Sequence, residues 1–184
     1  MLNRLWIWAG RVPKAEGPAV SDLVKGLMLV DERSRVSVMV LALGPRLRER
    51  LDLAKCLRLA VVGDLAPEAA ERLGGALAGL AGECRDRSSR EARLVETLRR
   101  LSGQMELNRV SAYRWSAEDR RRLFDVDHLA RRCAGDPLLA QLHDAVWSQG
   151  VERLRRAGEN PARVALDAMG YRKADDAEAA RRSC

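Results

Sequence analysis

The sequence predicts an all-α fold, a helical bundle, on three observations. The residues Ala, Leu, Arg and Glu, which favour helices, are abundant, and aromatic residues make up only 4% of the chain. Apolar residues recur at intervals of three and four along several segments, which is the period of an amphipathic helix. With 184 residues, 47% of them hydrophobic, the chain is long enough to bury one core without disulfides.

The first predicted helix covers about residues 32–50. Its apolar stripe consists of Val36, Val40, Leu43 and Leu47. Pro45 lies within this range, and proline lacks an amide hydrogen and clashes with the preceding turn of a helix. We therefore expect the helix to end or kink near Leu43 and Gly44.

A second helix follows, with an apolar stripe formed by Leu53, Leu57, Ala60 and Val61. The next turn brings Asp64 to about the same side, so we expect its carboxylate to point inward and to require a partner. Helical spacing continues from residue 69 to residue 80, although several glycines weaken it by up to about 1 kcal/mol each relative to alanine. Close helix packing would account for these glycines, which are Gly74, Gly75, Gly79 and Gly82.

The clearest helix follows a polar connection over residues 84–89. Ser88 or Ser89 can cap this helix, because a serine hydroxyl accepts a hydrogen bond from a free amide of the first turn. The apolar stripe repeats at four-three-four spacing through Leu94, Leu98, Leu101 and Met105. This spacing predicts one continuous buried face.

Two further helices are predicted in the next fifty residues. Ser116, followed by acidic residues, begins the first of them. Its apolar face contains Leu123, Val126, Leu129 or Ala130, and Cys133. The run Gly135-Asp136-Pro137 then ends this helix and starts another, with Asp136 as the N-cap and Pro137 at the first helical position. We expect the second helix to continue past residue 150.

The end of the chain differs in composition from the rest. Asn160-Pro161 starts one more short helix, to about residue 170, and residues 171–184 are charged and rich in alanine, as in a solvated helix or a mobile tail. We therefore divide the chain into a helical domain over residues 1–150 and a C-terminal helical extension with a charged tail over residues 151–184.

The chain is basic, with 33 Lys and Arg against 26 acidic residues and a net charge of +7. Such a charge suits contact with RNA, an acidic protein or anionic lipid, although an arginine-rich composition also arises from GC-rich coding. Candidate partner or nucleic-acid contacts are Trp6, Trp8, Arg120, Arg121, Arg122, Arg131 and Arg132. Interspersed acidic residues favour a merely solvated face for the arginines, and core packing is expected for at least two of the four tryptophans.

Neither a metal site nor a disulfide framework is expected. The four cysteines lie far apart without a CxxC pair, and the chain has only two histidines. No apolar run reaches the roughly 18 residues that a membrane span needs. The first fourteen residues are apolar and basic without an acid, like a mitochondrial targeting segment. We expect a retained first helix there, peripheral membrane contact through it, and a mitochondrial location, with the cytoplasm as the alternative.

Four segments, in order, resemble the HD-domain 5′-deoxynucleotidases. Residues 51–66 resemble a helix that ends in His-Asp-Leu-Ala-Glu in that family, and residues 30–36 resemble its Ala-Asp-His-Ser-Tyr-Arg-Val. Residues 89–101 are similar to its Thr-Pro-Glu-Ala-Arg-Phe-Val-Lys-Asp-Leu-Asp-Lys-Leu. Phe124-Asp125 and the later Pro137-Leu138 resemble the end of the family's sequence. The resemblance covers about residues 1–150 and implies an HD-domain-like helical bundle.

The resemblance also implies where the family's metal ligands fall. Two histidines and two aspartates bind the ion in the family, and the matching positions here are Glu32, Gly63, Asp64 and Arg99. Only Asp64 is retained, since glycine offers no side-chain ligand and arginine is always protonated. We expect no catalytic residue, metal or cofactor at this vestigial site. Instead we expect Arg99 to replace the charge of the ion by pairing with Asp64 and Glu32.

These observations predict a noncatalytic HD-domain-like subunit, a pseudoenzyme. We expect it to act as a structural or binding component of a larger assembly, such as a mitochondrial complex or a ribonucleoprotein, with other protein subunits and RNA as its partners. One alternative is a metal-dependent phosphohydrolase or 5′-nucleotidase that uses Glu32 and Asp64 in an altered site. Another is a sensor that binds a nucleotide without turnover.

Overall fold

The computed structural model describes residues 19–63, 65–124 and 126–168, and every regular element within these ranges is helical. The prediction of an all-α bundle is therefore confirmed. The α-helices are α2 (Val20–Met28), α3 (Glu32–Leu43), α4 (Leu53–Val62), α5 (Pro67–Leu73), α6 (Gly75–Asp86), α7 (Arg90–Arg109), α8 (Ala117–Phe124), α9 (Val126–Cys133), α10 (Pro137–Arg156) and α11 (Pro161–Ala168). Two short 3-10 helices are η1 (Gly44–Arg46) and η2 (Ala112–Arg114). The predictions for Trp6, Trp8, Asp64 and the tail lie outside the described residues.

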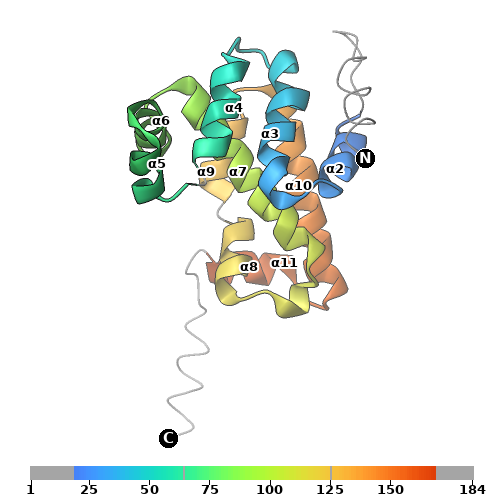
Figure 1. The fold of residues 1–184 in the computed structure, drawn as a ribbon. Helices are drawn as coiled ribbons and strands as arrows, with labels where there is room; N and C mark the ends of the chain where they lie inside the picture. The colour runs from blue at the N-terminus through green and yellow to red at the C-terminus, as the bar shows by residue number, and fades with distance from the viewer. Residues whose placement is uncertain (1–18, 64, 125, 169–184) are drawn as a thin grey trace, which may run out of the picture.

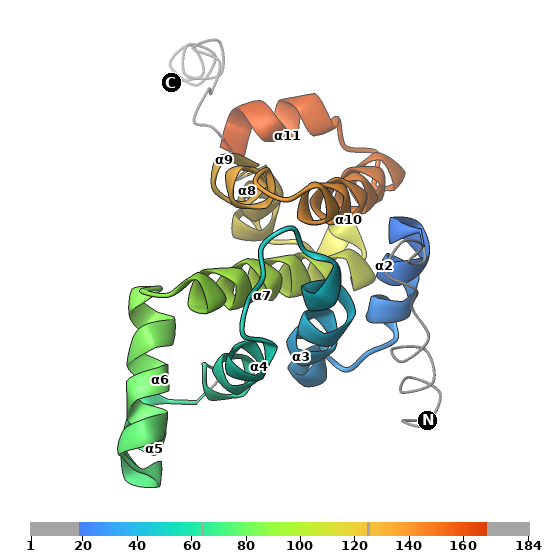
Figure 2. The same cartoon turned by 90° about the horizontal axis from the view of Figure 1, so that it is seen from above.

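The two longest helices, α7 and α10, pack against each other in the centre of the bundle. Helices α3 and α4 pack on α7, and α2 packs on α10 (Figure 1). Helices α5 and α6 form a hairpin that projects from the bundle near the start of α7 (Figure 2). Helices α8 and α11 pack together at the lower end of the molecule in Figure 1. No helix in the described ranges is long and apolar enough to cross a bilayer.

The main hydrophobic core lies between α2, α3, α4, α7 and α10. The predicted stripe on α7 is wholly buried within it, through Leu94, Leu98, Leu101 and Met105. A second, smaller cluster consists of Ala112, Trp115, Leu123, Val151 and Leu154. Because α10 runs through residue 150 and contributes to both clusters, it joins the predicted helical domain to the predicted C-terminal extension.

Three predicted helix ends are present in the structure. Helix α3 ends at Leu43, and Pro45 lies in the 3-10 turn that follows it. The Ser89 hydroxyl accepts a hydrogen bond of 3.1 Å from the amide of Ala92 at the start of α7. The Asp136 carboxylate accepts two hydrogen bonds from the first turn of α10. These ends form as predicted because each cap depends only on residues within one turn.

The predicted buried face of α4 was right at Ala60 and wrong at Val61. Ala60 is buried and Leu53 and Leu57 pack half-buried on the core, whereas Val61 is 63% exposed; Cys56 and Leu59 are fully buried. The reason is that residues 59–62 are all apolar, so the sequence does not show that Val62 is buried instead of Val61. Helices α3, α6 and α7 pack against α4 and select the face that includes Cys56 and Leu59.

The explanation of the glycines by close helix packing was also wrong. A Cβ atom added at Gly74, Gly75, Gly79 or Gly82 would meet no atom within 4 Å. Gly74 instead divides the predicted segment into α5 and α6, since its φ of 115° is a conformation that favours glycine. Helix α6 then continues to Asp86, so the polar connection to α7 is shorter than predicted.

The helix predicted over residues 116–133 is divided between α8 and α9. The two helices join different clusters, because Leu123 on α8 packs in the second cluster and Cys133 on α9 packs in the main core. At the start of α8, the Ser116 hydroxyl accepts a hydrogen bond of 3.1 Å from the amide of Asp119, whose carboxylate accepts one of 2.8 Å from the Ser116 amide. This reciprocal pair fixes the predicted beginning of the segment.

We expect Cys56 and Cys133 to resist alkylation in the folded protein. Burial raises the pKa of the Cys56 thiol to about 11 and that of Cys133 to about 12. At pH 8 the reactive thiolate therefore amounts to about one part in a thousand or less. Iodoacetamide labelling with peptide mass spectrometry should show both thiols unmodified in native protein and modified in denaturant. Equal labelling rates in the two conditions would contradict this burial.

Candidate functional site

The structure brings together two positions of the predicted vestigial site, Gly63 and Arg99. Gly63 is the residue that ends α4, and Arg99 lies in the middle of α7. The Arg99 Nη2 atom donates hydrogen bonds to the carbonyl oxygens of Leu59, at 3.2 Å, and Ala60, at 2.9 Å. A guanidinium is favoured there, because the last turn of a helix presents free carbonyls and the negative end of its dipole.

A glycine suits position 63 because the Arg99 guanidinium lies so close to it, and not because of the backbone conformation at this position. Its φ of −69° is accessible to any residue. A Cβ atom at this position, however, would overlap the guanidinium of Arg99. Position 63 and position 99 are therefore complementary in size, and a histidine at residue 63 would not fit beside Arg99 in this arrangement.

The other two predicted positions have different outcomes. Asp64 lies outside the described residues, so its pairing with Arg99 stays a prediction. Glu32 is exposed at the start of α3, and the expected ion pair with Arg99 is not among the contacts of the described residues. The reason is the register between α3 and α7: Arg35, one turn after Glu32, contacts Ser102, about one turn beyond Arg99.

We expect Gly63→Ala to destabilise the protein by about 1 kcal/mol, because the added methyl group displaces the Arg99 guanidinium from its two carbonyl acceptors on α4. Equilibrium urea unfolding measures the change. Gly79→Ala is the matched control, since it adds the same methyl group in open space on α6 and should be neutral or stabilising by up to about 1 kcal/mol. In an Arg99→Ala background the cost of Gly63→Ala should disappear. A Gly63→Ala protein as stable as Gly79→Ala would contradict the contact.

A cavity of about 370 Å³ adjoins this position. Its described lining residues are Val62, Gly63, Leu65, Ala81, Cys84, Arg85, Arg87, Glu96 and Arg99. Three of the four charged residues are arginines, and Glu96 accepts hydrogen bonds from Arg87 and Arg100. Within the described part of the chain, no three His, Cys, Asp or Glu residues cluster closely enough to hold a metal ion. The excess of arginines makes this cavity more suited to contact an anion than a cation.

The arginines predicted as partner contacts fall into different environments. Arg120 is internal: its Nε and Nη2 atoms donate to the Glu159 carboxylate at 2.9 and 2.6 Å, and it also donates to the carbonyls of Ala112 and Trp115. It is therefore a positioning residue that ties α8 to the start of α11. The proximity of Arg120 lowers the pKa of Glu159, chiefly through their hydrogen bonds.

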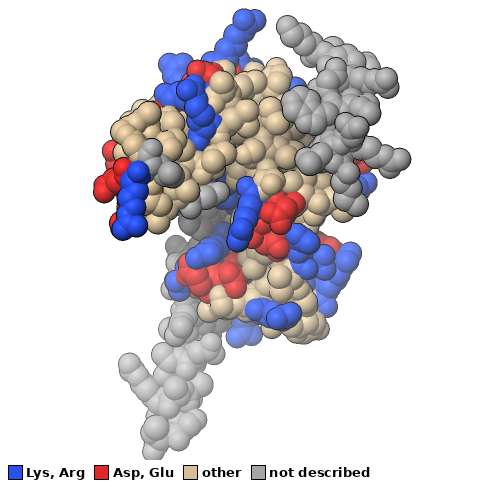
Figure 3. All heavy atoms as spheres, viewed as in Figure 1, with Lys and Arg blue, Asp and Glu red and all other residues tan. Residues whose placement is uncertain are grey.

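Arg121 and Arg122 remain on the surface, where both form ion pairs with Glu118 on their own helix. Figure 3 shows basic and acidic side chains interleaved over the lower part of this face, where α8 and α11 lie. This mixture supports the interpretation of a solvated face. Arg131 is also exposed, whereas Arg132 is half-buried and lines a second cavity.

Two of the four tryptophans belong to the interior. Trp115 is buried in the second cluster, and its indole Nε1 donates a hydrogen bond of 3.2 Å to the carbonyl of Leu107. Trp147 on α10 packs against the same cluster. Their role is packing, as expected for at least two of the four.

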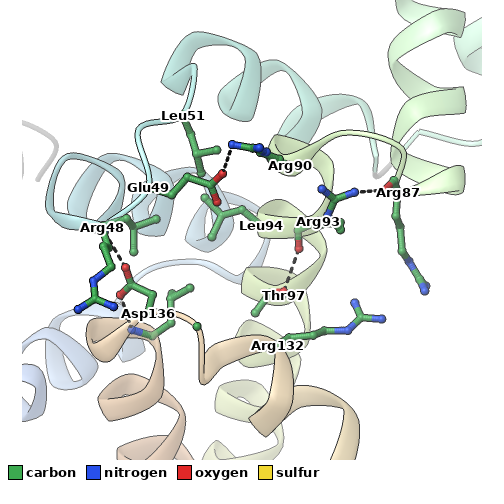
Figure 4. Close-up of a pocket in the computed structure, with 13 residues that line it drawn as sticks. Arg48, Glu49, Leu51, Arg87, Arg90, Arg93, Leu94, Thr97, Arg132 and Asp136 are labelled. Atoms are coloured by element: carbon green, nitrogen blue, oxygen red, sulfur yellow. Dashed lines mark hydrogen bonds and ion pairs between the residues drawn. The ribbon is translucent and has the colours of Figure 1, made fainter.

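The second cavity, of about 700 Å³, was not predicted, and we call it the arginine cavity. It lies between the connection that follows η1, the first half of α7, and the junction of α9 with α10 (Figure 4). The described lining residues are Leu47, Arg48, Glu49, Leu51, Arg87, Arg90, Arg93, Leu94, Thr97, Arg132, Gly135, Asp136 and Leu139. The spacing of Arg87, Arg90 and Arg93 was a local signal for a basic helix face. Nothing local indicated that Arg48 and Arg132 would join it.

The fold and these sites define an all-α helical bundle with an internal arginine at the predicted vestigial metal position and a basic cavity elsewhere. Comparisons with known proteins found no match among protein-family models, curated proteins or solved structures. The HD-like assignment therefore depends on the four sequence segments that carry the resemblance.

Proposed function

We propose that this protein is a noncatalytic HD-domain-like subunit that acts as a structural or binding component of a larger assembly. The observation that supports the proposal is the contact between Arg99 and Gly63. The resemblance assigns a metal-binding aspartate and a histidine to these two positions. Here an arginine occupies the space that a histidine side chain would need.

The contact also supplies a replacement for the tethering role of an ion. In the proposed ancestral site, a divalent ion would hold the end of one helix against the next. Arg99 on α7 instead donates to two carbonyls in the last turn of α4. Because a guanidinium stays protonated, it repels a divalent cation from the same position. The helices are thus held together by a permanent internal cation.

Metal analysis and a turnover assay test the loss of catalysis. We expect purified protein to contain far less than one divalent metal ion per chain and to release no phosphate from deoxynucleoside monophosphates. Stoichiometric metal with turnover that is abolished in Asp64→Asn would overturn the proposal and establish the phosphohydrolase alternative.

A gain-of-binding experiment tests the placement of the vestigial site. Gly63→His together with Arg99→Asp would place two donors beside the retained Asp64, so we expect divalent metal binding that titrates by calorimetry. Gly63→His alone keeps the obstructing guanidinium and should bind none. If the double variant remains helical by circular dichroism yet binds no metal, the HD-like placement fails.

The proposed assembly is mitochondrial, and its members are other protein subunits and RNA. Its support is the net charge of +7. The basic, apolar first fourteen residues support peripheral membrane contact. Gradient sedimentation of the tagged full chain should place it in a particle much larger than its own 20.5 kDa. Ribonuclease treatment should dissociate that particle if RNA holds it together, and sedimentation as a free monomer would contradict the proposal.

The sensor alternative is favoured by one observation, the arginine cavity. A nucleotide carries phosphates that arginine side chains bind through paired hydrogen bonds. Calorimetry with nucleotides separates a sensor, which binds without turnover, from a purely structural subunit.

A further inference from the structure

We infer that the arginine cavity binds a compact polyphosphate, such as the phosphate chain of a nucleoside diphosphate or triphosphate. This site is distinct from the vestigial metal position, and the inference does not depend on the loss of the metal. It extends the proposed function by assigning a ligand class to a particular set of residues.

Five arginines from separate segments line the cavity: Arg48 follows η1, Arg87 follows α6, Arg90 and Arg93 lie on α7, and Arg132 lies on α9. Arg132 is half-buried and the other four are exposed. Figure 4 shows Arg48 on one side of Leu94 and Thr97 and Arg87 and Arg132 on the other. The volume of about 700 Å³ falls within the range of roughly 300–1,000 Å³ of small-molecule sites.

The two carboxylates of the cavity are already occupied. Glu49 accepts a hydrogen bond of 2.6 Å from Arg90 Nη1. Asp136 accepts one of 2.7 Å from the backbone amide of Arg48, in addition to those from the first turn of α10. Arg87 is paired with Glu96 at 3.3 Å. The lining therefore has five arginines against two carboxylates, which leaves an excess of positive charge.

Three guanidinium groups are left without a carboxylate partner among the described residues, those of Arg48, Arg93 and Arg132. Arg93 is positioned through Nη1, which donates to the carbonyls of Arg87 at 3.3 Å and Ser88 at 3.4 Å. Like charges around one concavity repel one another and create a strong positive potential. A ligand with several negative charges relieves this repulsion.

The lining also indicates which part of a ligand is recognised. Its apolar residues are Leu47, Leu51, Leu94 and Leu139. None of the described lining residues is aromatic, so the cavity offers no platform on which nucleic-acid bases stack. Recognition therefore depends on phosphate groups, which favours a compact polyphosphate over a single-stranded RNA.

Calorimetry on the full chain at low salt, with adenosine triphosphate, guanosine triphosphate, inorganic tripolyphosphate and orthophosphate, tests the inference. We expect the two nucleotides to bind with affinities within about threefold of each other, because bases are not stacked. Tripolyphosphate should bind comparably, orthophosphate much more weakly, and all affinities should fall as salt rises. A nucleotide that binds while tripolyphosphate does not would overturn recognition by phosphate alone.

Substitutions locate the site. Arg48→Met, Arg93→Met and Arg132→Met should each lower the affinity for tripolyphosphate by about tenfold, since each removes one charge-assisted contact. Arg48→Met leaves the backbone bond to Asp136 intact, so its fold is preserved. Arg121→Met, which removes an exposed arginine on α8, is the matched control and should leave the affinity unchanged.

Three outcomes would overturn the inference. The first is equal weakening by Arg121→Met and Arg93→Met, which would indicate a diffuse effect of net charge. The second is tighter binding of a single-stranded RNA that lacks a terminal polyphosphate, with affinity that grows with length, which would assign the cavity to a nucleic-acid backbone. The third is that none of the phosphate compounds binds at low salt. Metal content and turnover are separate readouts, so failure here is distinguishable from failure of the proposed function.

Discussion

Replacement of Arg35 by methionine is expected to lower the free energy of unfolding by about 3–5 kcal/mol. Arg35 is fully buried between α3 and α7. Its guanidinium donates hydrogen bonds to the carbonyls of Leu27, Val30 and Ser102, and forms an ion pair of 2.9 Å with Glu106. Methionine fills a similar volume but removes all of these donated hydrogen bonds and the buried ion pair. Equilibrium denaturant unfolding at pH 7 measures the loss.

Arg109→Met is the control for this substitution. Arg109 pairs with the same Glu106 carboxylate at 3.3 Å, but its side chain is 48% exposed. Exposed ion pairs contribute at most about 1 kcal/mol, so this variant should remain close to wild type. Equal losses at residues 35 and 109 would show that the buried hydrogen bonds of Arg35 are not decisive.

The same contact predicts a dependence of stability on pH. The hydrogen bond from Arg35 is the main cause that lowers the pKa of Glu106 below its ordinary value of 4.5. The folded state therefore favours the ionised carboxylate, and its stabilising contribution is complete above pH 4.5 and is lost as the pH falls through the lower folded pKa. The stability difference between wild type and Glu106→Gln should shrink from pH 6 to pH 3. A difference that is constant over this range would contradict the shift.

Replacement of Arg120 by methionine is expected to cost about 2–3 kcal/mol. Arg120 forms a two-point ion pair with Glu159 and donates to carbonyls before α8, while its side chain is only 24% exposed. Without it, α11 loses its polar connection to α8. Denaturant unfolding measures the global cost, and hydrogen exchange should show faster exchange of the α11 amides. The amides of α7 should be much less affected.

Arg121→Met provides the comparison, because residues 120 and 121 are adjacent and chemically identical. Among the described residues, Arg121 is paired with Glu118 on the surface, so its loss should change stability by less than about 0.5 kcal/mol. A double-mutant cycle of Arg120→Met with Glu159→Gln should give a coupling energy of about 1–3 kcal/mol. Additive losses at these two positions would contradict the ion pair.

The positions of the helices and their ends were predictable in part: no helix was predicted over α2, and single helical segments were predicted where α5 with α6 and α8 with α9 form. Periodicity identified α7 and α10, Pro45 ended α3, and Ser89 and Asp136 cap α7 and α10. Each of these features depends on residues within about one helical turn, so local chemistry suffices. On α4 the prediction failed at Val61, because residues 59–62 are all apolar and the local pattern does not show which of them faces solvent.

The candidate sites were predictable only in part. The resemblance placed residues 63 and 99 in one site, and the structure places the Arg99 guanidinium against Gly63. The arginine cavity was missed, because it assembles side chains from the η1 connection, α6, α7 and α9. No pattern within one segment reports which side chains of another segment lie opposite.

Local sequence thus determined that this chain forms helices, where most of them begin and end, and that its surface is basic. Only the tertiary structure decided the role of each arginine. Arg35 is fully buried, Arg120 is half-buried, Arg121 pairs on the surface, and the exposed Arg48 and Arg93 lie beside a cavity, although all are the same residue type on or beside similar helices. The physical reason is that a guanidinium is stabilised inside a protein by carbonyls and carboxylates from distant parts of the chain. The fold alone brings those acceptors into reach.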